Sequence, residues 1–230
     1  MITTIAFDAD DTLWHTERIF LSVKDKYTAL LAEFAEKDYV ARYLDEMEER
    51  NIAHFGYGVK GFTLSMIETA CELTEGRITG DKIKQIIEFA REMLASPIET
   101  LEGVKETIKE LSGKYRLILI TKGDLLDQEA KLARSGLGEY FDVFEIVPRK
   151  DAKIYKYVLR RHKILPEEFV MVGNSLKSDI LPVLEIGARA VFIPYETEWF
   201  HEKVSDEELR DKDFVRLEKF TDLIAWMVRQ

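Results

Sequence analysis

Cysteine is nearly absent from this sequence, since Cys71 is the single one among 230 residues. One cysteine cannot form a disulfide within the chain. It lies on a stripe of apolar residues at helical spacing, which favours core packing over nucleophilic chemistry. We therefore expect a fold that is held by its hydrophobic core, in a reducing, cytoplasmic location.

Long apolar runs and net positive charge are also missing. No run approaches the ~20 apolar residues that cross a bilayer, and the first predicted strand begins too early to leave room for a signal peptide. Lysine and arginine number 33 against 43 acidic residues, a net charge of −10. This balance disfavours non-specific binding to nucleic acid or anionic membranes. We expect neither as a partner, and monomer and homodimer both stay open.

Asparagine and glutamine are scarce, with two and three copies, while charged residues make up 33% of the chain. This balance is typical of proteins from hot environments, so it indicates a thermophilic source. Hydrophobic residues make up 46%, enough for a sizeable core. The length suits one domain with a large insertion, or two small domains.

Short apolar runs separated by helical patterns set the fold class. Each gap after the second run has room for one helix, which is typical of βαβ crossovers. The predicted fold is therefore α/β, with a doubly wound, Rossmann-like parallel sheet as its core. The five predicted strands are Thr4–Phe7, Leu117–Ile120, Val143–Val147, Phe169–Val172 and Ala190–Ile193.

Residues 16–96 interrupt this alternation with four apolar stripes at helical spacing and no convincing strand. We predict a four-helix cap domain there, and a catalytic core made of residues 1–15 and 97–230. An insertion directly after the first strand is expected to cover that strand's carboxyl end as a lid. The glycine-rich segment 56–61 is the candidate in it for ligand contact.

Three carboxylates, Asp8, Asp10 and Asp11, follow the first apolar run within a few residues. Parallel strands present their chemistry at their carboxyl ends. Carboxylates this close repel one another, and a divalent cation offsets that repulsion. The alternative interpretation is a solvated turn or a helix N-cap.

The ends of the next two strands add an anion site and a cation. Thr121, Lys122 and Gly123 combine a hydroxyl with free backbone amides before a helix, an arrangement that suits a phosphate. Lys150 and Lys153 both follow the third strand. Either ammonium could point at the same edge of the sheet, although most lysines at strand ends are simply solvated.

The fourth strand ends in Gly173, followed by Asn174 and then Asp179. The glycine permits a sharp turn, and the two side chains offer hard oxygen ligands. Asp179 precedes an apolar helical pattern, so an N-cap role is the alternative.

These four pieces together resemble the signature motifs of the haloacid dehalogenase superfamily of hydrolases. The pattern is Asp-x-Asp-x-Thr, then Thr, then a lysine, then Gly-Asn-x-x-x-x-Asp, each after a strand. The resemblance also covers the helical insertion after the first motif and the segment 128–141. It therefore extends over nearly the whole chain.

The resemblance implies a role for each motif residue. Asp8 would be the nucleophile that accepts a phosphoryl group, and Asp10 the acid and base for the leaving alcohol and the water. Thr121, with the amides beside it, would hold phosphoryl oxygens. The motif lysine would neutralise charge on Asp8 and phosphate; we favour Lys150 and keep Lys153 as the alternative.

The resemblance also implies Mg²⁺ as cofactor. Its ligands would come from Asp8, the Asp10 backbone carbonyl, Asn174 and Asp179. None of the four histidines lies in a motif. Many relatives have aspartate where this chain has Asn174, so one negative charge is missing and weaker metal affinity is expected.

Phosphoryl transfer fits this set of residues best, because dehalogenases of the superfamily need neither the second aspartate nor a metal. We expect a phosphatase acting on a small phosphorylated metabolite, such as phosphoglycolate or a sugar phosphate. The alternatives are a phosphomutase or dehalogenase on the same fold, or a non-catalytic phosphate-binding module. A phospho-receiver module would need about half this length and would have no use for the cap.

Aromatic residues gather after the fifth predicted strand. Tyr195, Trp199 and His201 lie within seven positions. They are expected either to close over the edge of the core or to border the entrance of the site.

Overall fold

The computed structural model describes residues 1–197, 199 and 202–230. No helix in these ranges combines the length and the apolar character needed to cross a bilayer. The observed order of strands and helices is that of an α/β protein, which confirms the fold class predicted from the apolar runs.

The described chain divides into two compact units, each with its own core. The first unit contains the parallel sheet and comprises Met1–His15, Ile98–Lys122 and Gln128–Gln230. The second unit is helical and comprises Thr16–Pro97 and Gly123–Asp127. The second unit thus includes five residues that directly follow the strand carrying Thr121.

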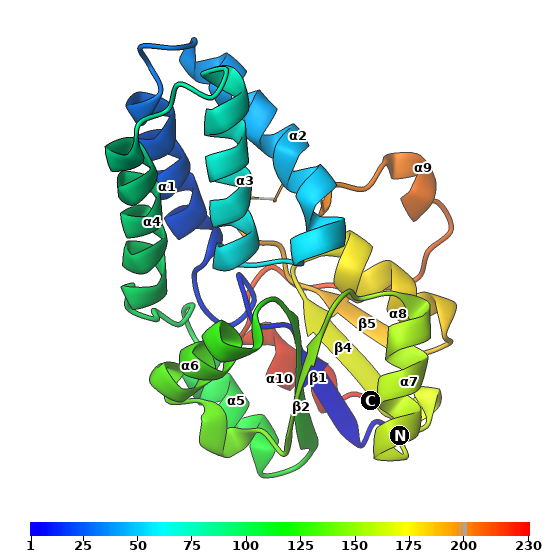
Figure 1. Ribbon diagram of the computed structural model, residues 1–230. Helices are drawn as coiled ribbons and strands as arrows, with labels where there is room; N and C mark the ends of the chain where they lie inside the picture. The colour runs from blue at the N-terminus through cyan, green and yellow to red at the C-terminus, as the bar shows by residue number, and fades with distance from the viewer. Residues whose placement is uncertain (198, 200–201) are drawn as a thin grey trace. The chain divides into compact units, whose positions relative to one another are not determined.

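Six parallel strands form one sheet in the first unit, in the order β3-β2-β1-β4-β5-β6 (Figure 1). This is the doubly wound arrangement, with the first strand in the middle and the chain running outward in both directions. The strands are β1 Thr4–Phe7, β2 Arg116–Lys122, β3 Val143–Val147, β4 Phe169–Gly173, β5 Arg189–Phe192 and β6 Val215–Arg216.

Strand boundaries agree with the sequence pattern to within two residues. The structure extends the second strand to Arg116 and Lys122, and it moves the fifth back by one residue to Arg189–Phe192. It also adds β6, which the sequence analysis missed. A two-residue strand is too short to show any alternation of apolar and polar positions.

Helices connect the strands of the first unit. Their bounds are α5 Val104–Ser112, α6 Leu125–Ser135, α7 Ala152–His162, α8 Leu181–Glu185, α9 Asp206–Leu209 and α10 Asp222–Met227. Short turns accompany them in the described ranges: 3₁₀ turns at Gly138–Tyr140 and Pro166–Glu168, and a π-helical turn at Leu176–Ile180.

Helix α7 shows how the sequence sets an element next to the site. The Asp151 side chain caps it by accepting from the Ile154 amide at 2.8 Å. At the other end, Lys163 adopts a left-handed conformation, and the last turn is basic. The N-cap Asp151 directly follows Lys150 and the helix begins at Ala152, so the cap fixes the chain just beyond that lysine.

The centre of the sheet is a topological switch point. Strand β1 pairs with β2 on one side and with β4 on the other, so that Phe7 has Leu119 and Val172 as partners. The Asp8 amide extends the second ladder by donating to the Val172 carbonyl at 2.9 Å. Residues that follow β1, β2 and β4 therefore meet at one edge of the sheet, where ligands bind in this class of fold.

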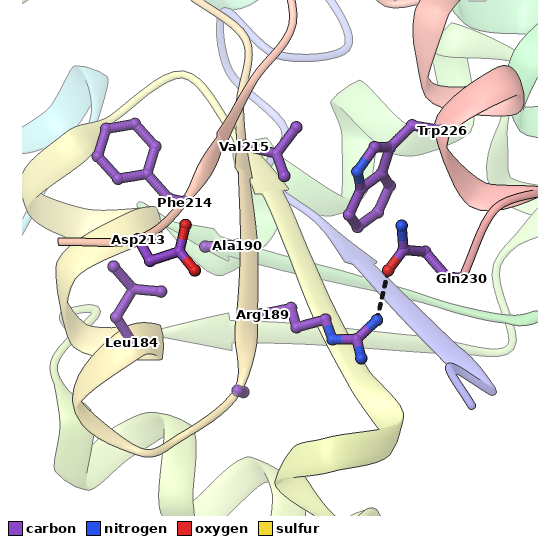
Figure 2. A pocket seen from close by; sticks show the side chains of 9 residues that line it. Leu184, Arg189, Ala190, Asp213, Phe214, Val215, Trp226 and Gln230 are labelled. Carbon is purple, nitrogen blue, oxygen red and sulfur yellow. Dashed lines mark hydrogen bonds between the residues drawn. The ribbon is translucent and has the colours of Figure 1, made fainter.

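A pocket of about 350 Å³ lies at the amino-terminal ends of the strands, opposite the switch point, where β5 begins (Figure 2). Its wall includes Trp226, Phe214 and Asp213. The Arg189 guanidinium donates to Gln230 across its rim at 2.5 Å. None of the residues lining it belongs to a predicted motif, so we place the site at the other end of the strands.

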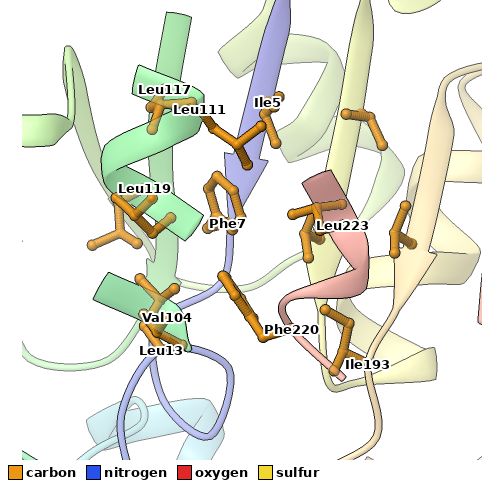
Figure 3. Close-up of a cluster of buried hydrophobic side chains, with 14 of the residues drawn as sticks. Ile5, Phe7, Leu13, Val104, Leu111, Leu117, Leu119, Ile193, Phe220 and Leu223 are labelled. Carbon is orange, nitrogen blue, oxygen red and sulfur yellow. The ribbon is translucent and has the colours of Figure 1, made fainter. Parts of the chain in front are cut away.

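Alternation along the strands buries both faces of the sheet. One cluster contains Ile5 and Phe7 and packs against α5 and α10 (Figure 3). The other contains Ala6 and Met171 and packs against α7 and α8. Each fully buried aliphatic or aromatic side chain contributes about 1.5–3 kcal/mol, so strands buried on both faces hold the residues at their ends in fixed positions.

The helical unit has a hydrophobic core of its own. Its helices are α1 Glu17–Leu30, α2 Lys37–Phe55, α3 Val59–Leu73 and α4 Gly80–Ala95. Their apolar faces share one buried cluster that includes Tyr27, Leu44 and Met66. Gly56–Gly58 join α2 to α3, and the rest of the glycine-rich segment, up to Gly61, forms the first turn of α3. In that turn Lys60 forms an ion pair with Asp124 at 2.9 Å.

Candidate functional site

The loop after β1 folds tightly back on itself. The Ala9 carbonyl accepts from the amides of Thr12 (3.3 Å) and Leu13 (2.8 Å). Asp11 adopts a positive φ of 60°, a conformation that aspartate tolerates better than most residues. This turn brings the carboxylates of the first motif to the carboxyl edge of the sheet.

Asp8 is buried and paired with a lysine. Its Oδ1 accepts from the Lys150 ammonium, which also donates to Asp179 Oδ1 at 2.7 Å. Lys150 is 6% exposed and Asp179 is fully buried. One cation therefore lies between two carboxylates in a site shielded from water.

Burial determines the electrostatics of this group. It raises the pKa of Asp8 to about 7, and the charge of Lys150 limits the rise. Burial alone would lower the pKa of Lys150, but Asp179 and Asp8 together raise it to about 12. The lysine is thus charged at neutral pH and favours the ionised form of Asp8.

Of the two candidate lysines, the structure brings Lys150 to Asp8. Lys153 lies on the exposed side of α7. The difference arises because Lys150 precedes the Asp151 N-cap and lies outside the helix, whereas Lys153 is the second residue of the helix.

Asp179 lies within the π-helical turn Leu176–Ile180, ahead of α8. Its Oδ2 accepts from the Ser175 amide at 3.1 Å. The cap of this turn is Ser175, whose hydroxyl accepts from the Ser178 amide at 2.9 Å. The alternative interpretation of Asp179 as an N-cap is therefore wrong, because its side chain is directed back at Lys150.

Asn174 and Thr12 connect the first and fourth motifs. The Thr12 hydroxyl donates to Asp8 Oδ2 at 3.4 Å and accepts from the Asn174 amide at 3.1 Å. With its carboxamide nitrogen toward the cluster, Asn174 also donates to the Asp10 carbonyl and to Asp8 Oδ2, both at 3.3 Å. A single side chain therefore reaches both oxygens that the family resemblance assigns to a metal.

The donor set here fits Mg²⁺. No group of three or more His, Cys, Asp or Glu side chains in the described ranges is arranged around a common metal position. The cluster instead offers a carboxylate oxygen of Asp8, a backbone carbonyl and an amide. Turning the Asn174 carboxamide over would present its oxygen to the same place, and hard oxygen ligands with several waters are what Mg²⁺ prefers. Asp179 is linked to this cluster through Lys150.

The Asp10 carboxylate points in another direction from its carbonyl. Its Oδ1 accepts from Trp14 Nε1 at 2.9 Å and from Lys131 Nζ at 3.0 Å. Its Oδ2 accepts from Gln128 Nε2 at 2.7 Å. Gln128 and Lys131 are site residues that sequence reasoning missed; the signal was two polar side chains three positions apart on the buried side of α6.

Thr121 and Lys122 end β2 beside this cluster. Thr121 is 1% exposed, and its hydroxyl donates to the Lys122 carbonyl at 3.1 Å. The Lys122 ammonium donates to Ser178 at 2.9 Å and forms an ion pair with Glu202. Gly123 has φ of 122°, which a side chain would strain, and it belongs to the second compact unit.

Glu202 is a third site residue that no sequence motif predicts. It is 9% exposed and accepts from Lys122 and from the Ser175 hydroxyl. Burial alone would raise its pKa, but Lys122 and hydrogen bonds from Ser175 and Ser178 together hold the pKa of this carboxyl below its usual value. The segment after β5 is thereby anchored to the ends of β2 and β4.

The aromatic residues after β5 divide between two places. The Tyr195 hydroxyl hydrogen-bonds His15 Nδ1 at 2.6 Å, where the first segment of this unit ends. The Trp199 ring lies 5.8 Å from the Lys122 ammonium. Trp199 therefore borders the site, whereas His201 lies outside the described residues.

The fold and the site together define an α/β protein with a doubly wound sheet and a buried Asp–Lys–Asp arrangement at the switch point of that sheet. A family profile described as haloacid dehalogenase-like hydrolase matches residues 2–187. The chain therefore belongs to this family, as its four motifs predict.

Individual relatives agree with this assignment. A crystal structure of a haloacid dehalogenase-like family hydrolase from Xanthomonas campestris has a TM-score of 0.88 and 38% identity, over 99% of this chain and 91% of the other. A glyceraldehyde 3-phosphate phosphatase from Methanothermobacter thermautotrophicus is 29% identical over 85% of this chain and 87% of its own. The Escherichia coli 5-amino-6-(5-phospho-D-ribitylamino)uracil phosphatase YigB is 27% identical over 97% and 96%. The chain is thus an enzyme that belongs with the phosphatases of the family.

Proposed function

We propose that this chain is a Mg²⁺-dependent phosphatase that hydrolyses small phosphomonoesters through a phosphorylated Asp8. The observation that carries the proposal is the buried contact of Asp8 with Lys150 at the switch point of the sheet. A second carboxylate, Asp10, follows two residues later. A nucleophile, a charge partner and an acid are therefore available at one edge of the sheet.

In the first step, an Asp8 carboxylate oxygen attacks phosphorus, and the bond between phosphorus and the ester oxygen breaks. Asp10 gives a proton to the departing alkoxide, which leaves as an alcohol. Lys150 offsets the repulsion between the Asp8 carboxylate and the phosphoryl group. Thr121 and the amides of the Lys122–Gly123 segment hold phosphoryl oxygens.

In the second step, Asp10 takes a proton from a water molecule, whose oxygen attacks the same phosphorus. The bond between phosphorus and Asp8 breaks, and inorganic phosphate leaves. Asp8 returns to its ionised form and Asp10 to its protonated form, so both residues are ready for the next ester.

Asp8, the Asp10 carbonyl and Asn174 would hold Mg²⁺, with Asp179 nearby through Lys150. When bound, Mg²⁺ supplies charge neutralisation at the phosphoryl oxygens. Asn174 is neutral where many relatives have aspartate, so we expect half-maximal activity to need more Mg²⁺ than an N174D variant needs.

We propose further that residues 16–96 act as a cap that selects the substrate. Four helices with a core of their own and the glycine-rich segment 56–61, which forms the α2–α3 connection and the first turn of α3, support this role. A cap of this size would exclude large folded phosphoproteins. The substrates would then be small, soluble esters.

The relatives suggest which esters to try first. One relative is named for glyceraldehyde 3-phosphate and another for a phosphoribitylamino-uracil. A screen should therefore contain glyceraldehyde 3-phosphate, phosphoglycolate, hexose phosphates and p-nitrophenyl phosphate, each with Mg²⁺. Release of inorganic phosphate is the measurement.

The decisive variant is Asp8→Asn. It keeps the size of the side chain and removes the nucleophilic charge, so we expect phosphate release to fall at least about 10³-fold. The control is Asp213→Asn, which removes one charge at the pocket on the opposite edge of the sheet and should leave the rate unchanged. Full activity of D8N would contradict the proposal.

The same screen tests the other chemistries of this fold. Halide release from a short 2-chloro acid would indicate a dehalogenase, and interconversion of sugar phosphates without phosphate release a mutase. Phosphate binding with no turnover of any ester would indicate a non-catalytic module. We expect none of these three outcomes.

A further inference from the structure

Asp10 uses its backbone and its side chain in two different places. Its carbonyl lies 3.3 Å from the Asn174 carboxamide, in the proposed metal site. Its carboxylate is 27% exposed and points toward α6, where Lys131 and Gln128 donate to it. The side chain that must meet the substrate oxygen is therefore held by groups that play no other part in the proposed reaction.

Both donors occupy buried positions on α6. Gln128 is 2% exposed and Lys131 is 8% exposed. A lysine is seldom this buried unless its charge is paired, and here it reaches Asp10 Oδ1 at 3.0 Å and Oδ2 at 3.4 Å. The amphipathic helix thus places two polar groups where apolar side chains would otherwise pack.

Packing alone does not explain a glutamine at position 128, because this side chain lowers the stability of the fold. Its Nε2 donates to Asp10 Oδ2 at 2.7 Å and to the Lys122 carbonyl at 2.9 Å. Its Oε1 is buried and has no hydrogen-bond partner among the described residues. An unsatisfied buried acceptor lowers stability, so a role beyond packing is needed to account for this residue.

We propose that Gln128 and Lys131 are positioning residues, which hold the Asp10 carboxylate in the orientation that proton transfer to the substrate's ester oxygen requires. Charge-assisted hydrogen bonds from two sides restrict both torsions of a short side chain. Placement of a reacting group in advance is a large part of catalysis. The inference rests on the proposed phosphatase function, and neither residue touches the reacting atoms.

The test compares esters whose leaving groups differ. An alkyl ester needs a proton on its departing oxygen, phenyl phosphate needs it less, and p-nitrophenyl phosphate hardly at all. We expect Lys131→Met to lower kcat/KM by about 10- to 100-fold for the alkyl ester and by less than about 3-fold for p-nitrophenyl phosphate. General disruption of the fold would lower all three values equally.

A second variant separates positioning from packing. Gln128→Met keeps the length of the side chain and removes the unsatisfied acceptor, so its melting temperature should equal or exceed that of the wild type. Its kcat/KM should nevertheless show the same dependence on the leaving group. A lower melting temperature with equal loss for every ester would overturn the assignment for Gln128.

Coupling to Asp10 is measured directly. In an Asp10→Asn background, Lys131→Met should cause no further loss, because a residue that acts through Asp10 has nothing left to position. Lys131→Arg keeps the charge and the donors and should recover most of the activity on the alkyl ester. The control is Arg134→Met, which removes a charge at an exposed position of the same helix and should change nothing.

The outcomes distinguish the two proposals. Losses that grow from p-nitrophenyl to alkyl ester and vanish in the D10N background support positioning. Equal losses on all esters, full activity of K131M, or additive losses with D10N overturn it while leaving the phosphatase function intact. Failure of the wild type to release phosphate from any ester would overturn the proposed function itself.

Discussion

Gly173 shows how one residue allows the site to close. It ends β4 directly beneath the Asp179 side chain. A Cβ at this position would lie 2.2–2.6 Å from the carboxylate and Cβ of Asp179, far inside any real contact distance. Asp179 cannot move aside cheaply, because it is fully buried and its oxygens are bound to Lys150 and the Ser175 amide.

We predict that Gly173→Ala disrupts the site and destabilises the sheet unit. The added methyl must displace Asp179 from Lys150, which leaves a buried charge without its partner. Overpacking with loss of such a pair costs about 2–5 kcal/mol. Urea unfolding should show the lower stability. Phosphate release should fall at least about 100-fold, because Lys150 is no longer held in place by Asp179.

The matched control is Gly80→Ala at the start of α4, where a Cβ would meet nothing within 4 Å. It should change stability by less than about 1 kcal/mol. A G173A variant as stable and active as G80A would show that the approach of Asp179 is not required.

At the scale of single elements, helices α1 and α2 bring several carboxylates together. Glu48 lies half-buried near Glu17 and Asp45, with Lys24 as the neighbouring cation. Burial first, then Asp45 and Glu17, raise the pKa of Glu48 to about 8. Lys24 limits the rise but is itself paired with Asp45 at 2.5 Å.

This shift predicts a stability that depends on pH. Between about pH 4.5, where Glu48 loses its proton in the unfolded chain, and about pH 8, Glu48 keeps in the folded unit a proton that it has lost in the unfolded chain. Glu17, whose pKa burial raises to about 7, adds to this difference at lower pH. The free energy of unfolding must therefore fall as pH rises through this window. Glu48→Gln removes the contribution of Glu48 and leaves that of Glu17, so it should stabilise the unit by about 1–2 kcal/mol at pH 9, with little change at pH 5.

Thermal unfolding followed by circular dichroism from pH 5 to 9 measures this difference. Glu49→Gln, at an exposed position of the same helix, serves as the control and should leave the wild-type dependence in place. If E48Q and the wild type stay parallel across the whole range, Glu48 is not the group responsible.

Much of the site could be predicted from sequence because each motif follows an apolar strand. Once the strands are parallel, Asp8, Thr121 and Asn174 must emerge at one edge. The same logic could not choose between Lys150 and Lys153. The two lysines are only three positions apart, and the sequence does not show which of them lies before the start of the helix and which lies on it.

The contacts that the sequence did not reveal depend on helix faces and on late segments. Gln128 and Lys131 reach Asp10 only because α6 turns that face inward, and amphipathic periodicity alone does not distinguish a buried lysine from a surface one. Glu202 follows no strand and belongs to no pattern. Its partner is 80 positions away in Lys122, and only the folded chain shows such a pair.

At the scale of the whole molecule, the two units have separate hydrophobic cores. The sheet unit buries Met171 with the strands and helices of its own cluster. The helical unit buries Met66 among the residues of α1 to α4. Both methionines are fully buried. Units with separate cores are expected to open separately, with different local stabilities.

We therefore predict that two equivalent methionine truncations act on different parts of the chain. Met66→Ala should destabilise the helical unit by about 2–4 kcal/mol. Amide hydrogen exchange should then quicken in peptides from residues 17–95, while peptides from β1, β2 and β4 keep their protection. Met171→Ala should give the reverse pattern. If M66A accelerated exchange equally throughout the chain, the two cores would have to unfold as one cooperative body, and a helical unit that opens while the Asp8 site stays assembled would be ruled out.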